Sequence, residues 1–161
     1  MKVEFKDFVI QHELIRLMSE EIRALHDRHY RETELSYLKH PMAPKYDRFA
    51  QLESMGAFVC YTVREILTGR MVGYLMYFVN ESLHGSYKTA QEDAYYVAPE
   101  HRGSGIARQL LRNAERDLAI HGVDYAFMSS KKPVGGPNIG LLLESEGYRE
   151  VAHVYCKKLE A

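Results

Sequence analysis

The stretch that decides the fold spans residues 95–111 and reads YYVAPEHRGSGIARQLL. It begins apolar and β-prone, passes through a proline and a glycine-rich turn, and continues as an amphipathic helix. Such a junction presents unpaired backbone N–H groups and the positive end of a helix dipole, which suit a phosphate or pyrophosphate. Gly103 and Gly105 let the backbone approach an anion, and Arg102 adds a cation. The stretch therefore predicts an anion site.

Length and composition indicate one globular domain over residues 1–161. Hydrophobic residues make up 46% of the chain and the formal net charge is −1, so the basic balance of a nucleic-acid binder is missing. The two cysteines, Cys60 and Cys156, lie in separate apolar runs and are expected to be buried, reduced thiols. We find no signal peptide and no apolar run long enough for a bilayer, and we expect a cytoplasmic protein without membrane contact.

Apolar periodicity predicts a mixed α/β chain with a partly antiparallel sheet. A turn signal at Thr68-Gly69 joins two strands as a hairpin, and Gly122 follows the long helix as its C-terminal signal. We expect irregular segments at residues 30–44 and 131–137. The expected strands are residues 2–10, 57–66, 71–79, 89–98, 125–129 and, as a final strand or hairpin, 148–159. The expected helices are residues 12–29, 45–55, 103–121 and 138–146.

Three kinds of glycine-rich phosphate loop can be compared with this turn. A P-loop requires a Lys-Ser/Thr pair after its last glycine, which is missing here. A dinucleotide fingerprint requires a third glycine, but Arg108 stands in its place. The run from Arg102 to Ala107 instead fits the pattern [RQ]-x-x-G-x-[GA]. With Val-x-Pro-Glu before it and Leu-Leu after it, the run resembles motif A of the GNAT acyltransferases, the Gcn5-related N-acetyltransferase superfamily.

The resemblance extends beyond this loop. Residues 71–75 (MVGYL) resemble the third strand of that family, and residues 141–148 (LLLESEGY) resemble its later helix and Gly-aromatic turn. The implied fold is a single α/β domain with a central, mostly antiparallel mixed sheet flanked by helices. In that fold a bulge splays the strand that carries Val97 from the next strand.

By resemblance, the donor substrate is acetyl-CoA. The loop amides hold its pyrophosphate, the backbone near Val97 pairs with its pantetheine arm, and the thioester lies in the gap between the splayed strands. Asn138 either contacts the cofactor arm or caps the later helix. The residues implied in cofactor binding are Tyr96, Val97, Arg102, Gly103, Ser104, Gly105, Ile106, Ala107, Arg108 and Asn138.

Acetyl transfer to an amine requires a neutral amine, a polarised thioester carbonyl and a proton for the leaving thiolate. In many relatives a carboxylate on the motif A strand deprotonates the amine, and here that strand carries Glu92 and Asp93. Strand alternation places these two residues on opposite faces, but the expected bulge breaks that parity, so both remain candidates.

The proton donor of many relatives is a tyrosine that precedes the Gly-aromatic turn. Leu143 occupies that place here, and Tyr155 on the expected last strand is the catalytic candidate that would replace it. Two imidazoles, His26 and His29, recur at helical spacing, but without further ligands they predict no metal site.

The sequence thus predicts an acetyl-CoA-dependent N-acetyltransferase that transfers the acetyl group directly to a primary amine. The amine belongs to a small molecule or a protein that the residues do not identify, and a homodimer is left open. Leu143 supports an alternative, a catalytically inactive acyl-CoA-binding or protein-interaction module on the same fold. An unrelated nucleotide-binding domain is a third hypothesis.

Overall fold

The computed structural model describes residues 2–34, 38, 40–130 and 138–159. Its strands form one sheet in the order β1-β2-β3-β4-β5-β6. Neighbouring strands are antiparallel except β5 and β6, which are parallel. The strands are β1 (Lys2–Phe5), β2 (Phe8–His12), β3 (Phe58–Glu65), β4 (Met71–Glu81), β5 (Lys88–Val97) and β6 (Tyr125–Phe127). The helices are α1 (Ile15–Thr33), α3 (Tyr46–Ser54), the short 3-10 helix η1 (Pro99–His101), α4 (Ile106–Ile120) and α5 (Gly140–Ser145).

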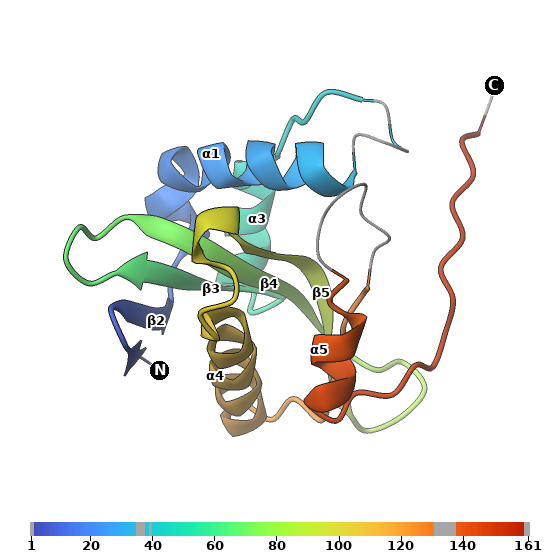
Figure 1. Cartoon of the computed structure of the whole chain (residues 1–161). Helices are drawn as coiled ribbons and strands as arrows, with labels where there is room; N and C mark the ends of the chain where they lie inside the picture. Colours follow the sequence, from blue (N-terminus) through green and yellow to red (C-terminus); the bar gives the residue numbers. More distant parts are fainter. Residues whose placement is uncertain (1, 35–37, 39, 131–137, 160–161) are drawn as a thin grey trace.

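The helices cover the sheet from both sides (Figure 1). On one side, Ile15, Met18 and Ile22 of α1 pack with Tyr74 and Met76 of the sheet. On the other side, α4 and α5 pack against a second apolar cluster that includes Leu75, Val97, Leu110 and Leu143. Apolar residues at helical spacing therefore bury one stripe of each long helix, as the sequence predicts.

A bulge interrupts the pairing of β4 with β5. Met76 pairs with Ala94 and Tyr77 pairs with Glu92, so Asp93 is the extra residue on β5. Strand β5 then pairs with β6 over only three positions, from Thr89–Tyr125 to Gln91–Phe127. An extra residue bends its strand and increases the local twist. Beyond Gln91 the two parallel strands separate, which is the predicted splay.

Two sequence expectations are wrong at the ends of the chain. Residues 2–10 form two strands rather than one, because a turn at Lys6 and Asp7 folds β1 back on β2, with Lys6 at φ 54°. Residues 148–159 form no strand or hairpin, and all the residues from 149 to 159 are exposed. Their β-branched and aromatic side chains favour a strand, but no described strand pairs with them. Cys60 is buried as expected, whereas Cys156 in this segment is exposed. The expected loop at 131–137 lies outside the described residues.

Candidate functional site

The glycine-rich loop lies between η1 and α4 and has the backbone geometry that an anion site requires. Gly103 and Gly105 have φ angles of +77° and +89°, which glycine adopts readily and residues with a Cβ atom rarely adopt. The Ser104 hydroxyl donates to the His101 carbonyl and accepts the Ile106 N–H at 3.3 Å, so it stabilises the loop from within. The amides of Gly103, Ser104, Gly105, Ala107 and Arg108 donate to no acceptor among the described residues. These donors are therefore available to a ligand.

The loop borders a cavity of about 370 Å³, which we call the loop cavity. Eight of the ten predicted cofactor-binding residues line it, while the other two, Ser104 and Ile106, do not. Ile106 is 1% exposed and belongs to the core beneath α4. The lining residues are His29, Glu32, Thr33, Glu92, Tyr95, Tyr96, Val97, Arg102, Gly103, Gly105, Ala107, Arg108, Ser129, Asn138, Ile139 and Leu142.

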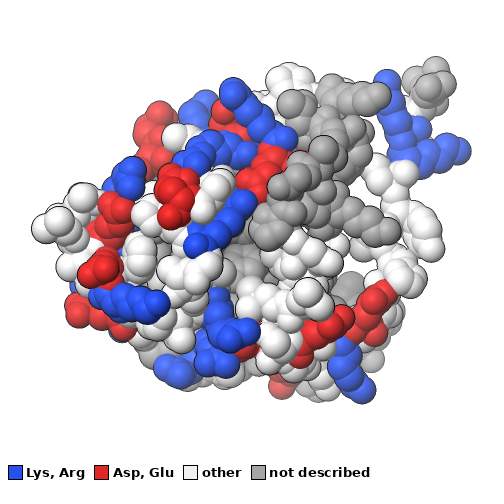
Figure 2. Space-filling model, viewed as in Figure 1, with Lys and Arg blue, Asp and Glu red and all other residues white. Residues whose placement is uncertain are grey.

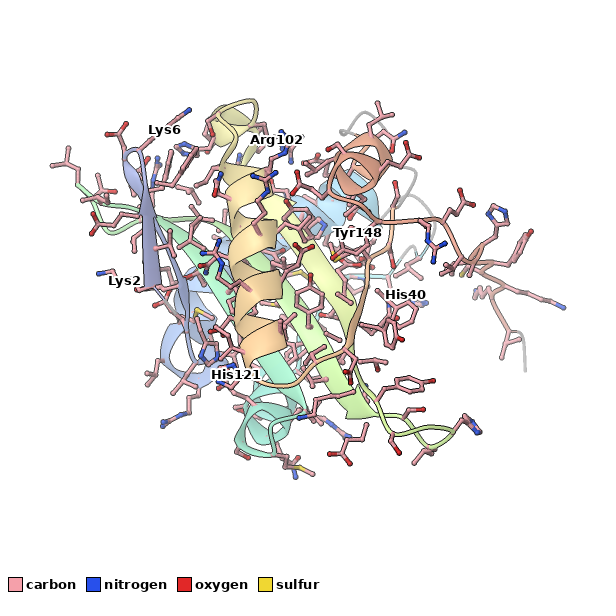
Figure 3. The ribbon with its side chains drawn as sticks, turned by 90° about the horizontal axis from the view of Figure 1, so that it is seen from below. Lys2, Lys6, His40, Arg102, His121 and Tyr148 are labelled. Atoms are coloured by element: carbon pink, nitrogen blue, oxygen red, sulfur yellow. The ribbon has the colours of Figure 1, made fainter. Side chains whose placement is uncertain are left out.

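Arg102 is not an isolated cation beside the loop. Its guanidinium donates two hydrogen bonds to the Glu32 carboxylate at 2.8 and 2.9 Å, and its Nε donates to the Val97 carbonyl. The guanidinium also lies 5.3 Å from the centre of the Tyr96 ring. Figure 3 shows Arg102 at the N-terminal end of α4. Because Glu32 offsets its charge, the backbone amides and the helix terminus carry more of the anion attraction than the sequence predicts.

Arg108 and Asn138 connect the elements around the loop cavity. Arg108 donates to the Ser145 hydroxyl at 2.9 Å and forms an ion pair with Glu146, which ties α4 to α5. The Asn138 side-chain oxygen accepts the Gly140 N–H at 2.9 Å, so Asn138 stabilises the turn that leads into α5, while Ile139 occupies the N-cap position. Asn138 also lines the cavity, so this hydrogen bond does not withdraw it from the site.

The bulge places the two carboxylate candidates in different cavities. Glu92 is 8% exposed, lines the loop cavity, and accepts the Ser129 N–H at 3.2 Å across the gap between β5 and β6. Asp93 instead lines a second cavity, on the α1 and α3 side of the sheet. The sequence left both residues open, whereas the structure gives each a separate environment.

The two residues considered for the thiolate proton lie outside the loop cavity. Leu143 is 6% exposed and packs in the core, so it offers no polar group. Tyr155 is 90% exposed in the segment after α5 and lines neither cavity. The expectation that a final strand brings Tyr155 to the site is therefore wrong, because residues 149–159 form no strand.

Sequence reasoning missed the polar groups that α1 and β5 bring to the loop cavity. His29, Glu32 and Thr33 reach it from the last turns of α1, about seventy positions before the glycine loop. Tyr95 lies beside the predicted Tyr96, and its buried hydroxyl has no hydrogen-bond partner among the described residues. Burial raises the Tyr95 pKa. The only available signal was the helical spacing of the polar residues at the end of α1.

The second cavity has a volume of about 440 Å³ and lies between α1, α3 and the bulged part of the sheet. We call it the α3 cavity. His29 lines both cavities, so the end of α1 adjoins each of them. The lining residues are His26, His29, Tyr30, Glu34, Met42, Pro44, Lys45, Arg48, Phe49, Leu52, Tyr74, Phe78, Asp93 and Ala94.

The surface charge, the potential metal ligands and the length of the helices are further features of the described residues that bear on function. Acidic and basic side chains are interspersed over the face that Figure 2 presents. Within the described ranges, no group of three or more His, Cys, Asp or Glu residues is arranged to hold a metal ion. No helix in the same ranges is long and apolar enough to cross a membrane.

Comparison with known proteins identifies the class of the chain. The profile of the Acetyltransferase (GNAT) family matches residues 20–141. The class that sequence and structure define together is therefore the acetyltransferase fold, with a glycine-rich loop beside the splayed part of the sheet. The chain belongs to the GNAT acetyltransferase family. No curated protein sequence matches the chain.

Several solved structures share this fold. An aminoglycoside acetyltransferase from an uncultured soil metagenomic sample is 17% identical, with a TM-score of 0.76 over 95% of this chain and 99% of that one. The ribosomal-protein-alanine N-acetyltransferase of Brucella melitensis biovar Abortus 2308 is 19% identical, with a TM-score of 0.71 over 94% and 99%. The glucosamine-6-phosphate N-acetyltransferase of Arabidopsis thaliana is 14% identical, with a TM-score of 0.67 over 95% and 99%. At these identities the likeness shows the fold alone.

Proposed function

We propose that this protein transfers an acetyl group from acetyl-CoA directly to a primary amine. The observation that carries the proposal is the loop cavity, which joins the unpaired amides of the glycine loop to the gap between β5 and β6. Acetyl-CoA is the donor that the family implies. Open space around Gly103, where an added Cβ would meet nothing within 4 Å, leaves the loop backbone accessible to a pyrophosphate.

Each part of the loop cavity fits a part of the donor. The amides of the loop and the N-terminus of α4 bind the pyrophosphate, and Asn138 and Ile139 from the start of α5 flank the arm. The backbone near Val97 lies beside the gap where β5 has left β6, and it can pair with an extended arm. Bound acetyl-CoA supplies an activated acetyl thioester.

Asp93 is our assignment for the proton acceptor. The incoming amine must lose a proton before its lone pair forms the C–N bond, and the C–S bond then breaks to release the thiolate. Asp93 lines the α3 cavity, which shares the lining residue His29 with the loop cavity. Glu92 accepts the Ser129 N–H and holds the edges of the gap in place. The role of Glu92 is therefore positioning.

The leaving thiolate takes its proton from water in this scheme. Leu143 has no proton to give, and burial raises the pKa of Tyr95, which makes this phenol a weaker acid. An ordinary thiol has a pKa of about 8.5, so a thiolate is a tolerable leaving group near neutral pH without a strong acid beside it.

Thiol release from acetyl-CoA in the presence of amines tests the proposal. We expect Asp93→Asn to lower kcat/KM at pH 7 by about 10²-fold or more, and the loss to shrink as rising pH deprotonates the free amine. Glu92→Gln is the matched control and should keep the wild-type pH profile. If Glu92→Gln instead lowers kcat/KM at pH 7 and recovers activity at higher pH, the assignment of Asp93 as the proton acceptor is wrong.

The inactive module remains the second candidate because Leu143 is buried where many relatives carry a tyrosine. It predicts acetyl-CoA binding with no thiol release for any amine. The same assay, run beside a binding measurement, separates it from the enzyme.

A further inference from the structure

The α3 cavity has the composition of a binding site for a small amphiphilic molecule. It is about 440 Å³ in volume and opens beside Asp93, the residue that we assign as proton acceptor. Ligand sites of this kind are mostly apolar, with a few polar groups that fix orientation. This inference rests on the proposed function and names the class of amine that the site accepts.

One wall of the α3 cavity is aromatic. The Phe49 ring of α3 lies 4.8 Å from the Phe58 ring and 6.3 Å from the Phe78 ring, measured between centroids. Leu52 and the buried Tyr74 extend this wall. Such a surface gains free energy by covering an aromatic or branched apolar group, and offers little to a polyhydroxylated sugar.

The two histidines of the cavity add polar groups that are hydrogen-bonded to tyrosines. His26 Nδ1 lies 2.9 Å from the Tyr46 hydroxyl, and His29 Nδ1 lies 2.8 Å from the Tyr74 hydroxyl. Burial lowers the pKa of His26 to about 4, so this imidazole is neutral near pH 7. The lysine and arginine side chains among the described lining residues are Lys45, just before α3, and Arg48 on α3.

The charged groups that line the cavity are balanced. Among the described residues, Glu34 and Asp93 contribute carboxylates, while Lys45 and Arg48 contribute cations. A polycation such as an aminoglycoside or a polyamine requires a surplus of carboxylates to offset its charges. A lining with two carboxylates and two cations instead suits a ligand that carries both an ammonium and an anionic group.

We propose that the acceptor is a zwitterionic amine of the amino-acid type with a large apolar side chain. Its amine lies toward Asp93, its side chain packs against Phe49 and Phe78, and its carboxylate is bound by Lys45 and Arg48. In the reaction Asp93 takes one proton from the ammonium, the neutral amine attacks the thioester carbonyl and forms the C–N bond, and the C–S bond breaks. The second proton of the nitrogen passes through water to the released thiolate, which leaves as the thiol.

Thiol-release kinetics with matched amines tests this acceptor class. The panel contains phenylalanine, leucine, glycine, phenylalaninamide, spermine and kanamycin. We expect kcat/KM for phenylalanine and for leucine to exceed that for glycine by at least about tenfold, because glycine has no apolar side chain to bury in the cavity. Phenylalaninamide should fall below phenylalanine because it lacks the carboxylate. Spermine or kanamycin as the best substrate would overturn the proposal.

A variant isolates the carboxylate contact. Arg48→Gln should lower the ratio of kcat/KM for phenylalanine over phenylalaninamide by about tenfold, the effect of losing one charge-assisted hydrogen bond. Arg116 is exposed on α4 and lines neither cavity, so Arg116→Gln is the matched control and should keep the wild-type ratio. An unchanged ratio in Arg48→Gln would contradict the assigned carboxylate site.

Calorimetry with acetyl-CoA separates failure of this inference from failure of the proposed function. Binding of acetyl-CoA together with transfer to spermine or kanamycin overturns only the acceptor class. Binding without transfer to any amine in the panel overturns the acceptor class and favours the inactive module. Absence of binding overturns the proposed function itself.

Discussion

His26 makes the stability of this fold depend on pH in a way that the structure quantifies. Its side chain is 9% exposed, its ring stacks on Tyr46 with centroids 5.7 Å apart, and it meets Tyr74 edge-on at 4.7 Å. The Nε2 atom has no hydrogen-bond partner among the described residues. Protonation would place a buried positive charge at this atom, and burial therefore lowers the pKa of His26 from 6.5 to about 4.

The sign and size of the effect follow from this pKa. The unfolded chain binds the proton near pH 6.5 while the folded chain resists it down to about pH 4, so stability is retained above pH 6.5 and lost as the pH falls through that window. The full difference corresponds to about 3 kcal/mol in the free energy of unfolding. Of this, roughly 2.5 kcal/mol is lost between pH 7 and pH 4.5.

Urea unfolding of wild type and His26→Gln at pH 7 and pH 4.5, followed by circular dichroism, measures the effect. Glutamine can retain a hydrogen bond to Tyr46 but does not titrate, and every other ionisable group is common to both proteins. We expect the wild type to lose about 2.5 kcal/mol more than the variant between the two pH values. Equal losses in the two proteins would refute the buried neutral state of His26.

Two further predictions concern the loop cavity. A Cβ at Gly73 would lie 2.9 Å from the Tyr96 carbonyl oxygen and 3.1 Å from Val97, so Gly73→Ala should lower the free energy of unfolding by about 1–3 kcal/mol in urea titrations. If Gly73→Ala is as stable as wild type, β4 and β5 can move apart to admit the methyl group without a loss in the free energy of unfolding. Glu32→Gln removes the negative charge that Arg102 pairs with, and should tighten acetyl-CoA binding by about fivefold in calorimetry at low salt. Weaker binding would mean that Glu32 is needed to hold Arg102 in position.

Local signals in the sequence were sufficient to predict most of the sheet and the loop. The Thr68-Gly69 turn signal identified the hairpin of β3 and β4, and Gly103 and Gly105 identified the loop before α4. These features depend on neighbouring residues, so the chain carries them in short stretches. The family resemblance added the bulge and the splay that residue patterns alone could not supply.

Contacts between distant segments could not be predicted in the same way. The ion pair of Glu32 with Arg102 joins residues seventy positions apart, and nothing local marks either residue as a partner of the other. The bulge at Asp93 shifts the alternation along β5, so the sequence could not decide which of Glu92 and Asp93 lines the loop cavity. The prediction for Tyr155 failed because β-prone residues indicate a tendency to form a strand, but they do not show whether a partner strand is present.

The central claim is that the loop before α4 binds the pyrophosphate of acetyl-CoA. Calorimetric titration of acetyl-CoA into wild type and Gly105→Glu tests it most directly. Residue 105 has a φ of +89° and borders the loop cavity, so a glutamate there would repel the anion and obstruct the loop. Saturable binding by wild type, lost in a variant with unchanged circular dichroism, is the expected result. Equal affinity in a folded Gly105→Glu protein would contradict the assignment of the loop.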